Sequence, residues 1–133
     1  MKDVSSEKPL KILEVIPALN SGGAERFVVD LCNQMARDEC EVTLLTMKNF
    51  SLRNFGFYKD DIASGVKVVN LGLGKFAPTT FYWLYRAIRQ QKCDVVHFHL
   101  TAMYFGVLAV LFDRKKKYIV TVSYTHLRAH ETK

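Results

Sequence analysis

Two short segments of the sequence combine residue types that could bind or transform a ligand. The first is PALNSGGAER, residues 17–26, in which the adjacent Gly22 and Gly23 precede a stretch of helical periodicity. Glycine lets backbone amides approach a ligand closely, and unpaired N–H groups at the start of a helix favour anions such as phosphate. A tight turn into the helix with Ser21 as its cap explains the same pattern, and spacing alone does not separate the two interpretations.

The second segment is DVVHFH, residues 94–99, which ends in His97 and His99. Because side chains alternate along a strand, these two histidines share one face. A metal pair would need further ligands, and no cluster of Asp, Glu and His with recognisable spacing supplies them elsewhere in the sequence. A histidine at a strand end is more often a hydrogen-bonded residue than a catalyst. His99 is therefore a catalytic candidate to be weighed against that simpler role.

The elements that would position these groups alternate between strands and helices along the chain. Short apolar runs rich in β-branched residues predict five strands, and longer runs with apolar residues at helical spacing predict the helices between them. The strands are expected at residues Lys11–Ile16, 41–46, 66–71, 94–99 and 118–122. The helices are expected at residues 24–37, at about 80–92 with Thr79 or Thr80 as the cap, and at 101–112. Residues 47–64 match neither pattern.

This order of elements predicts the α/β class, with one parallel sheet covered by helices on both faces. Right-handed crossovers then give a Rossmann-like, doubly wound sheet of about five strands in the order 3-2-1-4-5. In such a sheet, ligands gather at the carboxyl ends of the first and fourth strands, where both candidate segments lie. The first helix is expected to bury an apolar face made of Phe27, Val28, Leu31, Cys32 and Met35.

Length and composition limit the kinds of protein that this chain can be. With 133 residues, of which 49% are hydrophobic and 24% charged, it has the composition of one packed domain. The net charge of +6 comes from dispersed basic residues without interleaved aromatics, so we expect no nucleic-acid partner. The one dense basic run, residues 114–117, fits a solvated loop or a contact with an anionic membrane. Cysteines without CxxC spacing and the lack of a signal peptide favour the cytoplasm.

Together the two segments resemble a known enzyme family. The stretch KILEVIPALNSGGAERFVVDLCNQMA, followed by CDVVHFHL, is similar to the acceptor-side N-terminal domain of the retaining family 4 glycosyltransferases, over about residues 10–122. The SGGAER loop after a first strand is fairly specific to that family, whereas DVVHxH is shared more widely. The resemblance implies one half of a GT-B fold, and transfer of a sugar from a nucleoside diphosphate sugar to an acceptor without a metal or other cofactor.

The resemblance also implies roles for individual residues and partners. The residues expected to contact the diphosphate and sugar of the donor are Asn20, Ser21, Gly22 and Gly23, with His99 as a catalytic candidate and Glu25, Arg26 and His97 in support. The partners are a nucleotide sugar, a glycan or lipid-linked acceptor, and a C-terminal domain that would hold the nucleotide. We expect a role in cell-surface polysaccharide or glycolipid biosynthesis, in the cytoplasm or peripherally on the inner face of the membrane.

The end of the sequence has a different character. Residues 122–132, VSYTHLRAHET, look like the translation of a transposase adapter used in preparing DNA libraries. A native polar helix with His126 and His130 one turn apart is the rival interpretation. We expect a domain over residues 1–122, flexible over 1–9, and a non-native tail over 123–133 to which we assign no function. A chain cut short in this way is expected to be inactive alone.

Two other functions fit the same residues. A stand-alone flavodoxin-like domain could bind a phosphate ligand through residues 20–23, and another GT-B or epimerase-type enzyme acting on sugar nucleotides would share the fold. A nicotinamide enzyme is disfavoured, because the spacing is not GxGxxG and no acidic residue ends the second predicted strand.

Overall fold

The computed structural model describes residues 8–50, 56–74 and 77–121 and contains a five-stranded, entirely parallel sheet. The sheet order is β3-β2-β1-β4-β5, which confirms the predicted topology. The expected tail, residues 123–133, and most of the expected flexible start, residues 1–9, lie outside the described residues. The strands are β1 (Lys11–Ile16), β2 (Glu41–Lys48), β3 (Lys67–Leu73), β4 (Val95–His99) and β5 (Lys117–Thr121).

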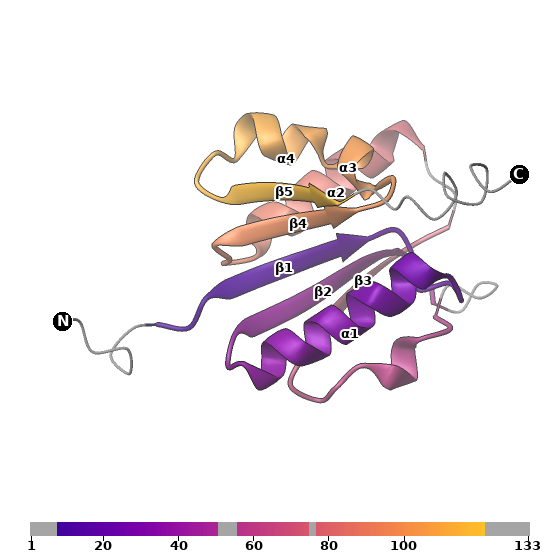
Figure 1. The fold of residues 1–133 in the computed structure, drawn as a ribbon. Coiled ribbons are helices and arrows are strands. Elements are labelled where there is room, and N and C mark those ends of the chain that lie inside the picture. The colour runs from indigo at the N-terminus through magenta and orange to yellow at the C-terminus, as the bar shows by residue number, and fades with distance from the viewer. Residues whose placement is uncertain (1–7, 51–55, 75–76, 122–133) are drawn as a thin grey trace, which may run out of the picture.

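Helices cover both faces of this sheet, as expected for a doubly wound fold. In Figure 1, α1 lies across one face, while α2, α3 and α4 lie together on the other. The chain order reverses between β1 and β4, so the topological switch point lies at the carboxyl ends of these two strands. The helical elements are α1 (Gly23–Arg37), the short 3₁₀ turn η2 (Lys59–Asp61), α2 (Pro78–Gln90), α3 (Ala102–Phe105) and α4 (Val107–Phe112).

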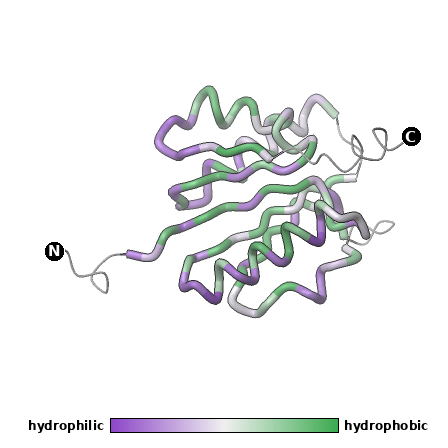
Figure 2. Tube along the Cα trace, in the orientation of Figure 1, coloured by the Kyte–Doolittle hydropathy of each residue, from purple (hydrophilic) through white to green (hydrophobic). Residues whose placement is uncertain are grey.

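Two hydrophobic clusters hold the layers together, one on each side of the sheet. The cluster beneath α2 and α4 is built around Leu13 and Phe98, and the cluster beneath α1 around Ile16, Val28 and Cys32. Figure 2 shows the hydrophobic stretches running along the central strands. The edge strands β3 and β5 are more exposed than the central strands, because each pairs with a strand on one side only.

The predicted apolar face of α1 is rotated in the structure. Val28 and Cys32 are buried as predicted, but Val29 is buried instead of Phe27, whose side chain is 52% exposed. Phe27 instead contacts the ring of His99 edge-on, with 6.5 Å between ring centroids. The prediction for Phe27 was wrong because helical periodicity locates the buried face of a helix only to within about one residue. Packing against the sheet then decides which residues at the border of that face are buried.

The start of α2 also differs from the prediction that Thr79 or Thr80 caps this helix. The helix begins at Pro78, and Ala77 is the capping position. Thr80 lies inside the first turn, where its hydroxyl accepts a hydrogen bond from the backbone N–H of Ala77 at 2.9 Å. Thr80 thus stabilises the helix start from within, as the third residue of a capping box does.

The single helix predicted over residues 101–112 is two short helices. The break falls at Gly106, and the ring of the fully buried Phe98 fills the space that a side chain at this position would need. Gly106 has an ordinary negative φ of −87°, so it is the packing against Phe98 that requires glycine.

Gly106→Ala should therefore destabilise the fold. Inserting a methyl group into a filled core costs about 1–3 kcal/mol, because neighbouring groups must leave their preferred positions. Urea unfolding of the variant should show this loss relative to the wild type. Gly74→Ala is the matched control, since none of the described residues lies within 4 Å of a Cβ built at Gly74. Equal stability of the Gly106 and Gly74 variants would contradict the proposed role of Phe98.

Candidate functional site

The connection from β1 to α1 carries the glycine pair and is anchored on its buried side. Leu19 is fully buried and forms a parallel bridge with Gly56, and the carbonyl of Pro17 accepts hydrogen bonds from the backbone N–H groups of Met47 and Lys48 at 3.1 and 2.8 Å. The following residues Asn20 and Ser21 are exposed. A fixed base beneath an exposed turn is the arrangement that presents backbone groups to a ligand at the carboxyl edge of the sheet.

The N-terminus of α1 begins in this turn. Gly22 is the capping position and Gly23 the first helical residue, so the capping residue has no side chain that could bond to the helix terminus. The alternative in which Ser21 caps the helix is therefore wrong, because the helix begins one residue later than that cap requires. The first-turn N–H groups and the positive end of the helix dipole point outward here, and both favour an anion.

Glu25 lies over the same helix terminus. Its carboxylate folds back toward Gly22, so that a Cβ built on Gly22 would lie 2.5 Å from Oε1. Burial raises the pKa of the Glu25 carboxyl, although a hydrogen bond from its own backbone N–H acts in the opposite direction. Glu25 thus occupies part of the space that an anionic ligand would take, and its side chain would have to turn away on binding.

Arg26 was expected to support the site, but it points elsewhere. Its guanidinium pairs with Asp30 at 3.3 Å and with Asp61 at 3.4 Å, and it lies 5.7 Å from the centre of the Tyr58 ring. These contacts join α1 to the segment around η2, whose position the sequence did not reveal. The structure therefore gives Arg26 a role in holding this segment and does not bring its charge to Gly22 and Gly23.

A buried cluster of polar side chains lies beneath α1, on the neighbouring strands β1, β4 and β5. Glu14 is 1% exposed and His99 is 2% exposed. Glu14 lies beside His97 in the register of β1 and β4, 3.0 Å from Nδ1, and its Oε1 is 2.5 Å from Nε2 of His99. On the other side, Nε2 of His97 lies 2.5 Å from the hydroxyl of Thr121.

One assignment of protons satisfies the whole cluster. Both histidine rings donate an N–H to the Glu14 carboxylate, and the Thr121 hydroxyl donates to the remaining nitrogen of His97. The two rings share one face as predicted, with 4.0 Å between their centroids. The cluster joins three strands at their carboxyl ends through hydrogen bonds that no apolar residue could make.

Burial and hydrogen bonding act in opposite directions on Glu14. Burial alone would raise the pKa of its carboxyl, but the hydrogen bonds from His97 and His99, and the positive charge of these rings when they are protonated, outweigh burial and lower that pKa. Glu14 is therefore held ionised inside the fold. In turn, burial raises the pKa of the Cys32 thiol on α1, and the Glu14 carboxylate adds to this effect.

Sequence reasoning missed Glu14 and Thr121. A signal for Glu14 was present, because a single acidic residue inside the otherwise apolar run KILEVI needs a partner when the strand is buried. That partner could not be identified, since it lies 83 residues further along the chain.

The backbone is also unusual next to His99. Leu100 has a positive φ of 58°, which costs a residue with a side chain roughly 1–2 kcal/mol. Its N–H donates to the carbonyl of Thr121 at 3.3 Å. This turn fixes the chain directly after β4, so the carboxyl edge is held by a constrained backbone as well as by the cluster.

Glu14, His97 and His99 could also be considered as metal ligands. Their ligand atoms all lie within 4.8 Å of one another. In the structure, however, these atoms already bond to each other or to Thr121, and no buried side-chain nitrogen or oxygen in the described ranges lacks a partner. The cluster is therefore complete as a hydrogen-bonded unit.

Comparison with protein families decides what kind of chain carries this site. The model of glycosyltransferase family 4 matches residues 21–131, which is most of the chain. The chain belongs to glycosyltransferase family 4. No curated protein and no solved structure matches it. The family match begins within the exposed turn that precedes α1 and includes α1 and β4, so both candidate segments contribute to it.

Membership of glycosyltransferase family 4 gives the geometry a chemical context. The parallel Rossmann-like sheet is the architecture expected for one half of a GT-B fold. No helix within the described ranges is both long and apolar enough to span a bilayer. The adapter origin that we expect for residues 123–133 stays a prediction.

Proposed function

We propose that this chain is the acceptor-side domain of a retaining glycosyltransferase that moves a sugar from a nucleoside diphosphate sugar to a glycan or lipid-linked acceptor. The observation that carries the proposal is the glycine-led N-terminus of α1 at the switch point between β1 and β4, in a family 4 chain. This is where a doubly wound sheet binds ligands, and where backbone groups favour phosphate.

The geometry fits the charge that develops in this reaction. As the glycosidic bond to the diphosphate breaks, negative charge grows on the leaving group and must be stabilised by fixed donors. The amides that follow Asn20, with Gly22 and Gly23 at their centre, can supply such donors without a metal. In the part of the chain that the structure describes, nothing lies within 4 Å of a Cβ built at Gly23, so a ligand can approach the backbone closely.

In this proposal His99 is a positioning residue. Its side chain is 2% exposed and its Nε2 is bonded to Glu14, which leaves only Nδ1 for any other contact. A ring held in this way is poorly placed to exchange protons with a ligand at the surface of the domain. Glu14, His97 and His99 instead hold β1, β4 and β5 rigidly beneath the turn that binds the diphosphate.

The wider assignments extend the same proposal. The nucleotide would be held by a second domain, whose basic and acidic residues complete the site. The reaction would serve cell-surface polysaccharide or glycolipid synthesis, with the protein in the cytoplasm or peripherally on the inner face of the membrane.

Transfer assays with the chain and with the complete protein test this proposal. The complete protein, incubated with a panel of labelled nucleotide sugars and a lipid extract, should transfer one of the sugars with retention of anomeric configuration. The 133-residue chain alone should transfer none, because donor, acceptor and charge-stabilising groups must be held in one site. Transfer by the chain alone would contradict the two-domain site. Binding of a phosphate ligand without any transfer by the complete protein would favour the flavodoxin-like alternative.

A further inference from the structure

A basic pocket lies at the edge of the sheet opposite the glycine turn. It has a volume of about 620 Å³ and is formed where α2 ends and where the chain passes from α4 into β5. Figure 1 places this connection at the amino ends of the strands, away from the start of α1. Its lining residues are Arg89, Leu111, Phe112, Asp113, Arg114, Lys115 and Lys116.

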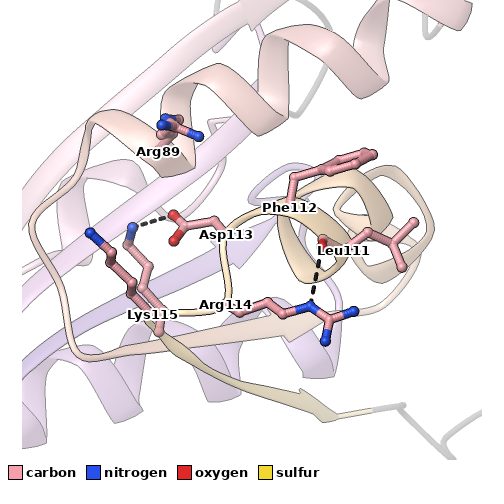
Figure 3. A pocket seen from close by; sticks show the side chains of 7 residues that line it. Arg89, Leu111, Phe112, Asp113, Arg114 and Lys115 are labelled. Carbon is pink, nitrogen blue, oxygen red and sulfur yellow. Dashed lines mark hydrogen bonds and ion pairs between the residues drawn. The ribbon is translucent and has the colours of Figure 1, made fainter.

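The charges of this pocket are unbalanced. Among the described residues that line it, Asp113 is the only acidic one, and Lys116 pairs with it at 2.5 Å. In Figure 3, Arg89 and Lys115 lie on the same side of the pocket as Asp113, whose ion pair is drawn as a dashed line, and Arg114 extends beside Leu111. Arg89 bonds to the hydroxyl of Tyr85, and Arg114 to the carbonyl of Leu111. In the described part of the chain, Arg89, Arg114 and Lys115 therefore have no carboxylate partner.

Large apolar side chains are exposed beside these cations. Phe112 is 65% exposed and Leu111 is 50% exposed, and Val107 and Val110 on the same helix are each 41% exposed. Figure 2 shows the resulting contrast, with α4 hydrophobic and the loop after it hydrophilic. Exposed Leu and Phe side chains beside Lys and Arg are the combination found in segments that lie at the interface of an anionic membrane.

From this arrangement we propose that α4 and the loop after it form a docking surface for an anionic lipid bilayer. The apolar side chains of Leu111 and Phe112 enter the interface, while Arg89, Arg114 and Lys115 contact lipid phosphates. A pocket for a small soluble anion would need the cations but not the exposed apolar side chains. A surface for single-stranded nucleic acid would need several aromatic rings for stacking, and among the described residues that line the pocket only Phe112 is aromatic.

The proposal deepens the peripheral location given under the proposed function, and vesicle binding tests it without any sugar transfer. The 133-residue chain is sedimented with phosphatidylcholine vesicles that contain or lack phosphatidylglycerol. The chain should bind only the anionic vesicles, less tightly as salt is added. Each basic residue near such a surface strengthens binding about fivefold, so Arg114→Glu with Lys115→Glu should weaken it at least about 30-fold.

Two further variants make the test specific. Lys59→Glu with Lys67→Glu changes the net charge equally at exposed residues outside the pocket and should retain most of the binding. Leu111→Ser with Phe112→Ser keeps every cation but should weaken binding at least about tenfold, because burial of these side chains is lost. Equal effects of both charge reversals would overturn the proposal. The proposal would also be overturned if the Leu111→Ser, Phe112→Ser variant bound the vesicles as tightly as the wild type and inorganic phosphate competed with that binding. Those two results together would indicate a site for soluble anions.

Discussion

In the complete protein, Gly23→Val should lower the rate of sugar transfer about 100-fold or more, which is the typical loss when one preorganised donor is removed from an oxyanion site. The new side chain would project into space that is open around Gly23 in the structure. If the donor diphosphate binds there, the side chain separates the phosphate from the backbone amides. The loss should appear in kcat/KM for the donor at saturating acceptor.

The structure makes this substitution informative, because the fold should tolerate it. No described residue lies within 4 Å of a Cβ at Gly23, and this residue begins a helix without a positive φ. The melting temperature should therefore change by no more than a few degrees. Gly65→Ala, at a position away from the carboxyl edge with only an ordinary contact to Ala36, is the control and should transfer normally. Unchanged turnover of the Gly23 variant at normal stability would show that the glycine pair only forms a turn.

Glu14→Ala should have the largest effect on stability, a loss of about 3 kcal/mol or more. Removing one partner from a buried hydrogen-bonded charged cluster leaves the others unpaired. Here the buried ring of His99 and the partly buried ring of His97 would lose the carboxylate that both contact. Glu14→Gln should lose less, because the amide retains an oxygen acceptor for one ring. Urea unfolding measures both variants, and Glu41→Gln, an exposed acid at the start of β2, is the control.

The stability that Glu14 contributes should also depend on pH, and the same variants can measure this dependence. The pKa of Glu14 is lower in the folded chain than its ordinary value of 4.5, despite burial, because the two histidines favour the ionised carboxylate. The stability that Glu14 contributes is therefore fully present above about pH 4.5 and is lost as pH falls through the lower folded pKa. The difference in unfolding free energy between wild type and Glu14→Gln should shrink in that range. If this difference in unfolding free energy stayed constant below pH 4.5, Glu14 could not be the ionised centre of the cluster.

Local patterns in the sequence determined most of the architecture. Apolar runs and helical periodicity predicted the strands and helices, and the handedness of crossovers converted their order into the observed sheet. The shared face of His97 and His99 also followed from local geometry, since alternation along a strand needs no knowledge of its neighbours. The family resemblance rested on the same segments, and the match to family 4 confirmed it.

Tertiary structure decided the features that depend on contacts between distant parts of the chain. Only the register of β1 against β4 reveals that Glu14 lies beside His97, because register depends on packing across the sheet. Likewise, the ring of Phe98 explains why the helix predicted over residues 101–112 breaks at Gly106. The cations at the end of α4 were visible in the sequence as a run. That Arg89 from α2 joins them, beside exposed Leu111 and Phe112, is a result of how the helices pack.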